Sequence, residues 1–455
     1  MKRNTKGGAE LDAEIAQMGS GRAMVLHPDI DTRETRGASE QGQRRSPEEK
    51  LVEALGLAEA IDLEITYTEI LRLTKLRPAT LLGTGTIERF HQLIQASEIE
   101  VAIIDCALSP IQQRNLERAW NCKVIDRTAL ILEIFGARAR THEGRLQVEL
   151  ASLTFQRSRL VRSWTHLERQ RGGAGFLGGP GESQIELDRR QIDDRIIQLK
   201  GDLEQVTKTR SLHRRARTRT PYPIVAFVGY TNAGKSTLFN RLTNAGVMAK
   251  DMLFATLDPT MRRLNLPSGR EVILSDTVGF ISELPTHLVA AFRATLEEVL
   301  EADVIVHVRD ISHPETEHQK RDVELVLDDL GVLERIRHDR SLEALNKIDQ
   351  MDTESRSAMV ARNEPTRVAL SAITGQGCTG LIERIETILS IGELRLRYDL
   401  DPADGAAIAW LHQHGRVFEQ KMQDADLSVC VFLASDDASR FDDRFVPRRR
   451  TIALP

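Results

Sequence analysis

One stretch of the sequence constrains the fold more than any other. An apolar segment, IVAFV at residues 224–228, runs directly into GYTNAGKS at residues 229–236, which has the GxxxxGK[ST] pattern of a phosphate-binding loop between a strand and a helix. Its glycines let consecutive backbone N–H groups surround phosphate oxygens at a helix N-terminus, while Lys235 neutralises the β- and γ-phosphates and Ser236 offers Mg²⁺ a hydroxyl. The expected phosphate contacts are Gly229, Tyr230, Thr231, Asn232, Ala233, Gly234, Lys235, Ser236 and Thr237.

A second motif follows the strand expected at residues 271–275. It reads DTVG and comprises Asp276, Thr277, Val278 and Gly279. Asp276 is expected to hold Mg²⁺ through water, and the Gly279 N–H to meet the γ-phosphate.

Two motifs further along the chain indicate a guanine base. In NKID, Asp349 can accept hydrogen bonds from N1 and N2 of guanine, a face that adenine lacks, while Asn346 and Lys347 are expected to brace the loop and cover the base. Ser371 and Ala372 follow a strand expected at residues 367–370, so that the Ala372 N–H is expected to reach O6 of guanine.

With these four motifs in this order, the sequence resembles the P-loop GTPase family. The resemblance implies GTP and GDP as ligands, Mg²⁺ as cofactor and GTP hydrolysis as the activity. It also implies that Thr256, in the switch I segment FATLDPT, closes on Mg²⁺ and the γ-phosphate, with Thr260 as the alternative. The catalytic residues so implied are Lys235, Thr256 and Gly279, and the metal ligands are Ser236, Thr256 and Asp276.

The residue after DTVG departs from many such GTPases. They carry a glutamine there to orient the attacking water, whereas this chain has Phe280, whose side chain cannot hydrogen-bond. We therefore expect slow intrinsic hydrolysis, with a partner surface, a cation or backbone groups completing the site. The alternative interpretation of Phe280, that it packs in a core, is compatible with this expectation. Asn232 stands where potassium-stimulated relatives place an asparagine, so K⁺ is a further candidate cofactor.

Apolar clusters before the nucleotide motifs alternate between helical and extended spacing. The expected helices span residues 51–60 and 87–93, and the expected strands 63–67, 101–104 and 124–125. This alternation predicts a small parallel α/β domain at residues 48–140. Residues 1–47 are polar and rich in glycine and charge, so we expect a mostly flexible tail.

Two heptad-like apolar seams, at residues 146–160 and 192–206, predict an antiparallel helical hairpin within residues 141–219. Between them the segment 172–184 holds six glycines and a proline, so we expect a mobile tip without regular structure, with a plain flexible connection as the alternative. The segment 208–219 carries six basic residues and no acid, although the chain has 62 Lys and Arg against 67 Asp and Glu. Such charge asymmetry favours a nucleic-acid partner over a solvated linker.

Long strings outside the nucleotide motifs narrow the resemblance. They are LSPIQQRNLE at 108–117, VIDRT at 124–128, ILEIF at 131–135, HLERQ at 166–170 and GGPGESQIELDRR at 178–190. These segments resemble the HflX family over about residues 51–390. Gly83 to Thr86 departs from that family's glycine pair with lysines, so we expect a strand-to-helix turn there rather than a second nucleotide site.

The HflX resemblance implies a GTPase that binds the large ribosomal subunit and its rRNA and splits or rescues stalled or idle ribosomes, with hydrolysis stimulated by the ribosome. The alternatives are an RNA-binding remodelling factor in which hydrolysis only resets binding, and a GTP-regulated factor acting on a non-ribosomal protein or tRNA-modification partner. We expect a cytoplasmic monomer, with loose membrane association left open. No uninterrupted apolar run approaches the roughly 20 residues of a membrane-spanning helix.

The expected fold class is α/β. The GTPase domain at residues 220–391 is expected to have a mixed, mostly parallel sheet with helices on both faces. In residues 392–455 apolar residues alternate at 394–400 and 427–433 around a helix expected at 405–414, which predicts a small α+β appendage of unassigned role. The arginines at 448–450 are expected to form a solvated end rather than an RNA contact.

Overall fold

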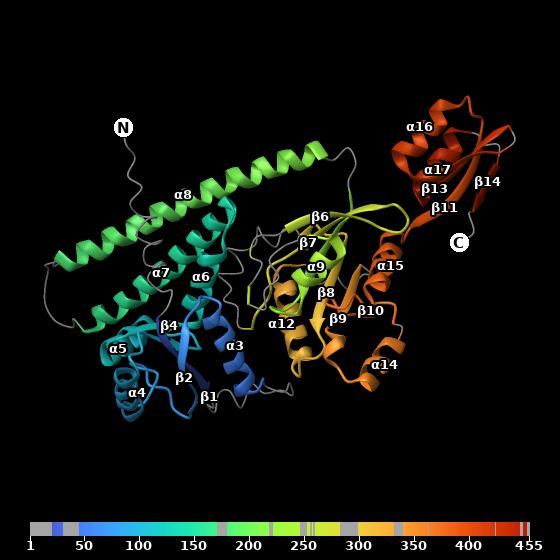
Figure 1. Cartoon of the computed structure of the whole chain (residues 1–455). Coiled ribbons are helices and arrows are strands. Elements are labelled where there is room, and N and C mark those ends of the chain that lie inside the picture. Colours follow the sequence, from blue (N-terminus) through green and yellow to red (C-terminus); the bar gives the residue numbers. More distant parts are fainter. Residues whose placement is uncertain are drawn as a thin grey trace.

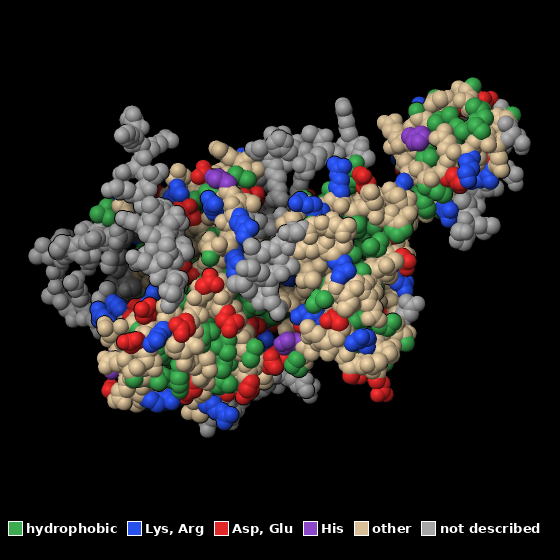
Figure 2. Space-filling model, in the orientation of Figure 1, with side chains coloured by type: hydrophobic (Ala, Val, Ile, Leu, Met, Phe, Trp, Pro, Cys, Tyr) green, Lys and Arg blue, Asp and Glu red, His purple; other side chains and the backbone are tan. Residues whose placement is uncertain are grey.

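The computed structural model describes residues 21–30, 45–170, 180–217, 222–245, 253–254, 257, 260–282, 299–331, 340–362, 364–423, 425–445 and 449–452. Within these residues three sheets follow one another along the chain, and a pair of long helices connects the first sheet to the second (Figure 1). Side chains of both charges are interspersed over the face of the N-terminal unit seen in Figure 2. The C-terminal unit contacts the unit of the second sheet through Arg270 and Glu393, 2.7 Å apart, and through Arg416, which donates to Ser268. No helix in the described part of the chain combines the length and apolarity needed to cross a bilayer.

The first sheet is parallel and has the strand order β2-β1-β3-β4. Its elements are β1 (Arg22–Ile30), α3 (Pro47–Glu59), β2 (Glu64–Leu73), α4 (Thr84–Ser97), β3 (Val101–Ile104), α5 (Pro110–Trp120), β4 (Lys123–Asp126) and α6 (Arg127–Arg138). Successive residues of a strand face opposite sides, so Val25 and Ile103 pack with α3 and α6, whereas Leu26 and Ile104 pack with α4 and α5. The elements from α3 to α6 thus belong to a parallel α/β unit, as expected.

Strand β1 contradicts the prediction of a flexible tail over residues 1–47. It pairs with β2 on one side and β3 on the other, and its residues Ala23 to Leu26 are completely buried. A strand buried on both faces needs only a short apolar run, here AMVL, and the polar composition on either side obscured it. Pro28, which has no N–H to donate, lies beyond the residues that pair with β3.

The long helices are α7 (His142–Gln170) and α8 (Pro180–Arg217), which form the expected antiparallel hairpin (Figure 1). Ion pairs join them at Arg157 and Asp193, 3.2 Å apart, and at Arg195 and Glu149, 2.7 Å apart. Helix α8 begins at Pro180, so the prediction that all of residues 172–184 lack regular structure is wrong: proline at a first helical position favours a helix start. Residues 171–179 lie outside the described residues, as do 218–219 of the basic segment, whose earlier part is helical.

The second sheet has the order β10-β9-β8-β5-β7-β6 and is parallel except for β6 against β7, which confirms the expected mixed, mostly parallel sheet. Its strands are β5 (Ile224–Val228), β6 (Thr260–Asn265), β7 (Glu271–Asp276), β8 (Val304–Asp310), β9 (Ser341–Asn346) and β10 (Arg367–Ala369). Helices α9 (Lys235–Thr243) and α15 (Cys378–Leu389) pack on one face, and α12 (Thr316–Asp329) packs on the other. Helix α14 (Thr353–Ala361) precedes β10.

The third sheet is antiparallel, with the order β12-β13-β11-β14. It contains β11 (Glu393–Leu400), α16 (Gly405–His414), β12 (Arg416–Gln423), β13 (Asp426–Ala434), α17 (Ser435–Arg444) and β14 (Arg449–Ile452). The expected helix at residues 405–414 is therefore confirmed. Both helices pack on one face of the sheet, where Tyr398, Trp410 and Phe441 are buried together.

Candidate nucleotide-binding site

The glycine-rich loop lies between β5 and α9, at the carboxyl edge of the second sheet. Gly229 and Gly234 have φ values of 153° and 91°, and a Cβ at either position would collide, with the Val308 carbonyl oxygen and the Asn346 side-chain amide respectively. Asn232 adopts a left-handed conformation with φ of 59°. The loop therefore needs these residue types to turn tightly against β8 and the end of β9.

Lys235 is the first residue of α9, and its side chain folds back over the loop. Its Nζ donates to the carbonyl oxygens of Gly229 and Tyr230, at 3.1 and 2.8 Å. Burial lowers the pKa of Lys235 to about 8, against the opposing effect of Asp276. A phosphate group brought to this ammonium would supply the negative charge that its buried surroundings lack.

Ser236 and Asp276 meet directly, because the Ser236 hydroxyl donates to Asp276 Oδ2 at 2.7 Å. The carboxylate of Asp276 is buried at the end of β7. Hydroxyl and carboxylate oxygens are the donors that Mg²⁺ prefers, so this pair fits that ion. Thr256, the third expected ligand, lies outside the described residues. Among the described residues no group of three or more His, Cys, Asp or Glu side chains could hold a metal by itself.

Asn346 connects the glycine-rich loop to the loop after β10. Its Nδ2 donates to the Ala233 carbonyl at 2.8 Å, and its Oδ1 accepts from the Ala372 N–H at 2.9 Å. These two hydrogen bonds link the two loops through one side chain. The Ala372 N–H already has an acceptor here, so its expected contact with guanine O6 would have to share that hydrogen. Arg241 also holds this loop, donating to the Ala372 carbonyl at 2.6 Å.

Asp349 is half-buried in a single 3₁₀ turn, Ile348–Gln350, and its Oδ1 is buried without a hydrogen-bond partner among the described residues. A buried carboxylate oxygen without a donor is costly, and the N–H groups of a guanine base would supply one. Lys347 adopts φ of 67°, and its Nζ lies 2.7 Å from Asp310 Oδ2. Ser371, in turn, is fully buried and its Oγ accepts from the Thr374 N–H at 3.1 Å.

The DTVG segment presses against the glycine-rich loop. A Cβ at Gly279 would lie 2.9 Å from Thr231 Cα and 3.1 Å from Lys235 Nζ, so only glycine fits. The next residue pairs with the loop through its backbone: Thr231 N–H donates to the Phe280 carbonyl at 2.7 Å, and Phe280 N–H to the Gly229 carbonyl at 3.1 Å. The Thr277 hydroxyl holds the segment to β5 by donating to the Phe227 carbonyl at 2.6 Å.

The Phe280 side chain is buried in a core that the first and second sheets share. This cluster includes Phe135 of α6 and Phe254 of the switch I segment, whose ring centroids are 4.7 Å apart, and Val278 beside Phe280. The packing alternative stated for Phe280 is therefore what the structure contains. The ring fills apolar space and leaves no side-chain polar group to orient a water.

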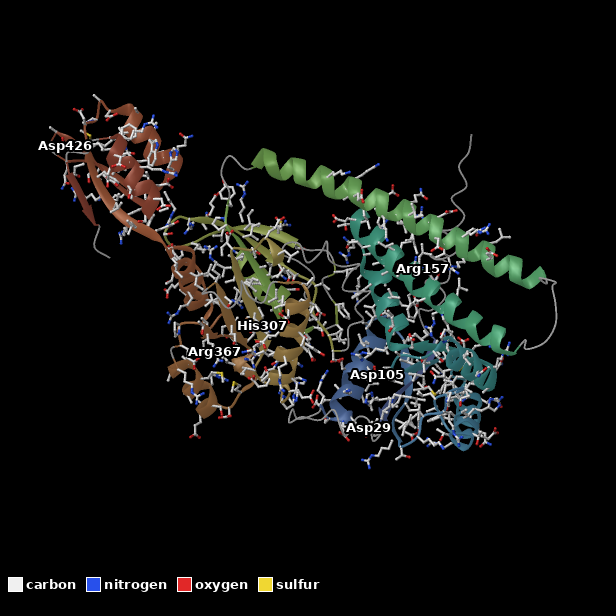
Figure 3. The ribbon with its side chains drawn as sticks, turned by 180° about the vertical axis from the view of Figure 1, so that it is seen from behind. Asp29, Asp105, Arg157, His307, Arg367 and Asp426 are labelled. Atoms are coloured by element: carbon white, nitrogen blue, oxygen red, sulfur yellow. The ribbon has the colours of Figure 1, made fainter. Side chains whose placement is uncertain are left out.

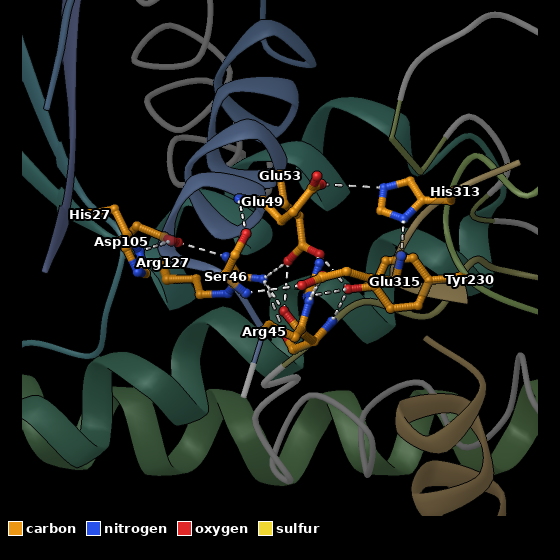
Figure 4. A network of polar contacts seen from close by, with 11 residues as sticks. His27, Arg45, Ser46, Glu49, Glu53, Asp105, Arg127, Tyr230, His313 and Glu315 are labelled. Atoms are coloured by element: carbon orange, nitrogen blue, oxygen red, sulfur yellow. Dashed lines mark hydrogen bonds and ion pairs between the residues drawn. The ribbon is translucent and has the colours of Figure 1, made fainter. Parts of the chain in front are cut away.

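A buried polar network crosses the same boundary (Figure 4). Glu53 of α3 accepts from the phenol of Tyr230, from the hydroxyl of Ser282 at 2.7 Å, and from Arg127 and Arg45. The Tyr230 phenol oxygen in turn accepts from the Ser282 N–H at 2.7 Å. One carboxylate of the N-terminal unit thus holds both the second residue of the glycine-rich loop and the segment after DTVG.

The charges of this network explain why the Glu53 carboxylate stays ionised although it is buried. Burial raises the pKa of Glu53, but Arg127 and Arg45 outweigh it and lower that pKa below its ordinary value. Burial and the nearby Glu53 raise the pKa of Tyr230, which keeps the phenol protonated as a donor. Arg127 also pairs with Asp105 at 2.6 Å. Sequence reasoning missed this network, since its members lie up to 270 positions apart and most of them belong to no motif.

Comparison with known proteins identifies the family to which the chain belongs. Residues 48–136 match the model described as GTP-binding GTPase N-terminal, residues 138–217 GTP-binding GTPase Middle Region, and residues 224–347 50S ribosome-binding GTPase. GTPase HflX of Magnetococcus marinus is 52% identical, over 84% of this chain and 88% of the relative. The chain belongs to the HflX family of GTPases.

Two further HflX relatives agree. GTPase HflX of Escherichia coli is 46% identical over 78% of this chain and 82% of the relative, and that of Lacrimispora saccharolytica is 42% identical over 85% and 89%. As an HflX-family member the protein is an enzyme that binds guanine nucleotide and hydrolyses GTP. The HflX resemblance expected from the sequence strings is thereby confirmed.

Proposed function

We propose that this HflX-family GTPase binds the large ribosomal subunit and its rRNA in the cytoplasm and splits or rescues stalled or idle ribosomes, with hydrolysis stimulated by the ribosome. The observation that carries the proposal is Phe280. It replaces the water-orienting glutamine and is 1% exposed in the shared core, so its side chain contributes nothing to hydrolysis. Of a partner surface, a cation and backbone groups, we expect a partner surface to complete the site, and a family model described as 50S ribosome-binding GTPase supports the ribosome as that partner.

Within this proposal the nucleotide is held by the residues of the four motifs. The N–H groups and Lys235 of the glycine-rich loop bind the phosphates, and Asp349 reads N1 and N2 of guanine. Ser236, Asp276 and Thr256 would hold Mg²⁺, which when bound neutralises charge on the β- and γ-phosphates. Asn232, in its left-handed conformation, is the candidate ligand of K⁺.

The decisive test is GTP turnover by the full chain, alone and with purified large subunits, combined with Asp349→Asn assayed with GTP and xanthosine triphosphate. We expect strong stimulation by subunits, and a preference for xanthosine triphosphate in the variant because an amide N–H can donate to its O2. Asp352→Asn is the matched control, since Asp352 caps α14 three residues away. Light scattering of intact ribosomes with GTP then measures splitting directly.

Unchanged turnover in the presence of subunits would overturn the ribosomal proposal. A non-ribosomal protein or tRNA-modification partner would then become the better candidate. Deleting residues 172–184 separates the same alternatives, because only a ribosome-directed hairpin predicts that subunit binding is lost with its tip.

A further inference from the structure

The C-terminal sheet has one face without helices. Both α16 and α17 pack on the face that carries Leu396 and Tyr398 of β11 and Val429 and Val431 of β13. Because side chains alternate along a strand, the intervening residues point to the other face. We call this second face the open face, and most of its side chains are at least half-exposed. The elements follow one another as β11-α16-β12-β13-α17-β14, and the strand order in the sheet is β12-β13-β11-β14.

Two aromatic rings and two guanidinium groups lie together on the open face. Phe418, at the irregularity in β12, and Phe432 of β13 have ring centroids 4.9 Å apart. The Arg395 guanidinium lies 4.8 Å from the Phe418 centroid, and that of Arg416 lies 4.1 Å from the Phe432 centroid. Flat π-faces and guanidinium planes in one layer are the groups on which unpaired bases stack.

Charged side chains flank these rings. Arg397 and Lys421 lie on the same face of the sheet as the two phenylalanines. The carboxylates on this side are Glu393, Asp399, Glu419 and, at the start of β13, Asp426. Glu393 pairs with Arg270 of the second sheet's unit at 2.7 Å and with Arg416 at 3.6 Å, Asp399 pairs with Arg397 at 3.2 Å, and Glu419 pairs with Lys421. Arg395 Nε is buried and has no hydrogen-bond partner among the described residues. Among the described side chains, four cations and four carboxylates thus share the open face.

The helical side of the same unit is more acidic. Helix α17 carries Asp436, Asp437, Asp442 and Asp443 against Arg440 and Arg444. The sheet face therefore differs from the helical face by its aromatic rings with guanidinium groups lying over them. Rings and guanidinium groups in one layer match the bases and phosphates of a nucleic acid, whereas the core of a protein interface is depleted in charged residues and needs more apolar area than two rings provide.

We propose that the open face binds a single-stranded RNA segment, with bases stacked on Phe418 and Phe432 and phosphates beside Arg395, Arg397 and Lys421. The choice of RNA over DNA rests on the proposed ribosomal function; binding of a single strand does not. Arg395 adds both charge and a stacking plane, since its guanidinium already lies over the Phe418 ring.

A tryptophan placed in the layer reports stacking at this face alone. In the full chain carrying F432W, titration with a uridine oligomer of about ten nucleotides should quench the new indole emission, because a stacked base quenches tryptophan. Wild-type protein, with Trp120, Trp164 and Trp410, gives the background signal. Emission of F432W that stays unchanged at saturating oligomer would overturn the proposal, even if RNA binds elsewhere.

Affinity is measured by fluorescence anisotropy of the same oligomer, labelled with fluorescein. The double variant F418A/F432A should bind at least roughly 30-fold more weakly, from the usual contribution of a base on an aromatic ring, counted once for each of the two rings. R395K keeps the charge but loses the planar group, so it should also weaken binding. R440A is the matched control: Arg440 is exposed on α17, away from the open face. Circular dichroism melting establishes that each variant is folded.

Wild-type affinity in F418A/F432A overturns the inference. So does a variant that loses binding to isolated ribosomal proteins while keeping the oligomer, because the open face would then dock a protein. GTP turnover with large subunits separates this inference from the proposed function. Quenching without stimulation would reject the ribosomal partner and keep the single-strand site, whereas stimulation without quenching would do the reverse.

Discussion

The phenol of Tyr230, in the glycine-rich loop, donates a hydrogen bond to the Glu53 carboxylate of helix α3. The two residues belong to units built on different sheets and are 177 positions apart in sequence. Because the same phenol oxygen accepts from the Ser282 N–H, a single side chain ties the nucleotide loop, the segment after DTVG and the N-terminal unit together.

Tyr230→Phe removes this hydroxyl and leaves its buried partners short of one contact. We expect the free energy of unfolding of the full chain to fall by about 1–3 kcal/mol, the usual cost of unpairing a buried polar group. Tyr222→Phe is the control, since Tyr222 meets Arg263 through the face of its ring, 5.0 Å from the guanidinium. Urea unfolding followed by circular dichroism measures both, and equal losses would contradict the role of the phenol.

Asn346→Ala should uncouple the two loops that Asn346 joins. Both of its hydrogen bonds are buried, so we expect a loss of about 1–3 kcal/mol in the free energy of unfolding and weaker binding of GDP. Calorimetric titration with GDP is the direct measurement. Gln350→Ala changes an exposed residue four positions further along the chain and should leave the affinity for GDP unchanged. If Asn346→Ala bound GDP as tightly as the wild type, the link between the two loops would be dispensable.

Gly279→Ala places a methyl group 2.8 Å from Thr231 Cγ2 and 2.9 Å from its Cα, so the DTVG segment must move. This movement would break the backbone pairing of Phe280 with the loop. A displacement of this size near reacting groups typically reduces rates by roughly 100-fold. GTP turnover measures the effect. Gly85→Ala, where an added Cβ meets nothing within 4 Å, should turn over GTP like wild type.

His307 gives the fold a sensitivity to acid. It is buried in the middle of the second sheet (Figure 3), and burial, aided by Arg309, lowers its pKa from 6.5 to about 3. Between these pH values the unfolded chain binds a proton that the folded chain does not. Stability contributed by neutral His307 is therefore present above pH 6.5 and is lost as the pH falls towards 3.

At about pH 5 this loss amounts to about 2 kcal/mol. His307→Leu should thus flatten the decline of the urea midpoint between about pH 7 and pH 5, whereas His412→Leu, on the exposed side of α16, should not. An unchanged slope in His307→Leu would assign the acid sensitivity to other groups.

The sequence was most informative where residues that act together are adjacent. Gly229 to Ser236 form one loop whose geometry follows from their own backbone, and Asp349 follows a buried strand that delivers it to the same edge. Alternating apolar residues likewise predicted β11 and β13 of the C-terminal sheet, but not β12 or β14. In each case a local pattern was enough, because the element itself places the side chains.

Features that depend on distant partners were not predictable. Glu53 and Arg127 carry no local signal, and only the packing of α3 and α6 against the second sheet turns them into a network. Strand β1 is short and surrounded by polar sequence, so its apolar run became recognisable only beside β2 and β3. Pro180, by contrast, carries a local helix-start signal that the glycines around it obscured.

The core shared by Phe135, Phe254 and Phe280 has a consequence for how the protein is made. During synthesis α6 leaves the ribosome well before the residues that cover it, which at ordinary elongation rates leaves its apolar face open for on the order of ten seconds. We expect the nascent N-terminal half to be a chaperone client during that interval. Because each half covers apolar surface of the other, either half transferred to another protein would carry an exposed apolar patch.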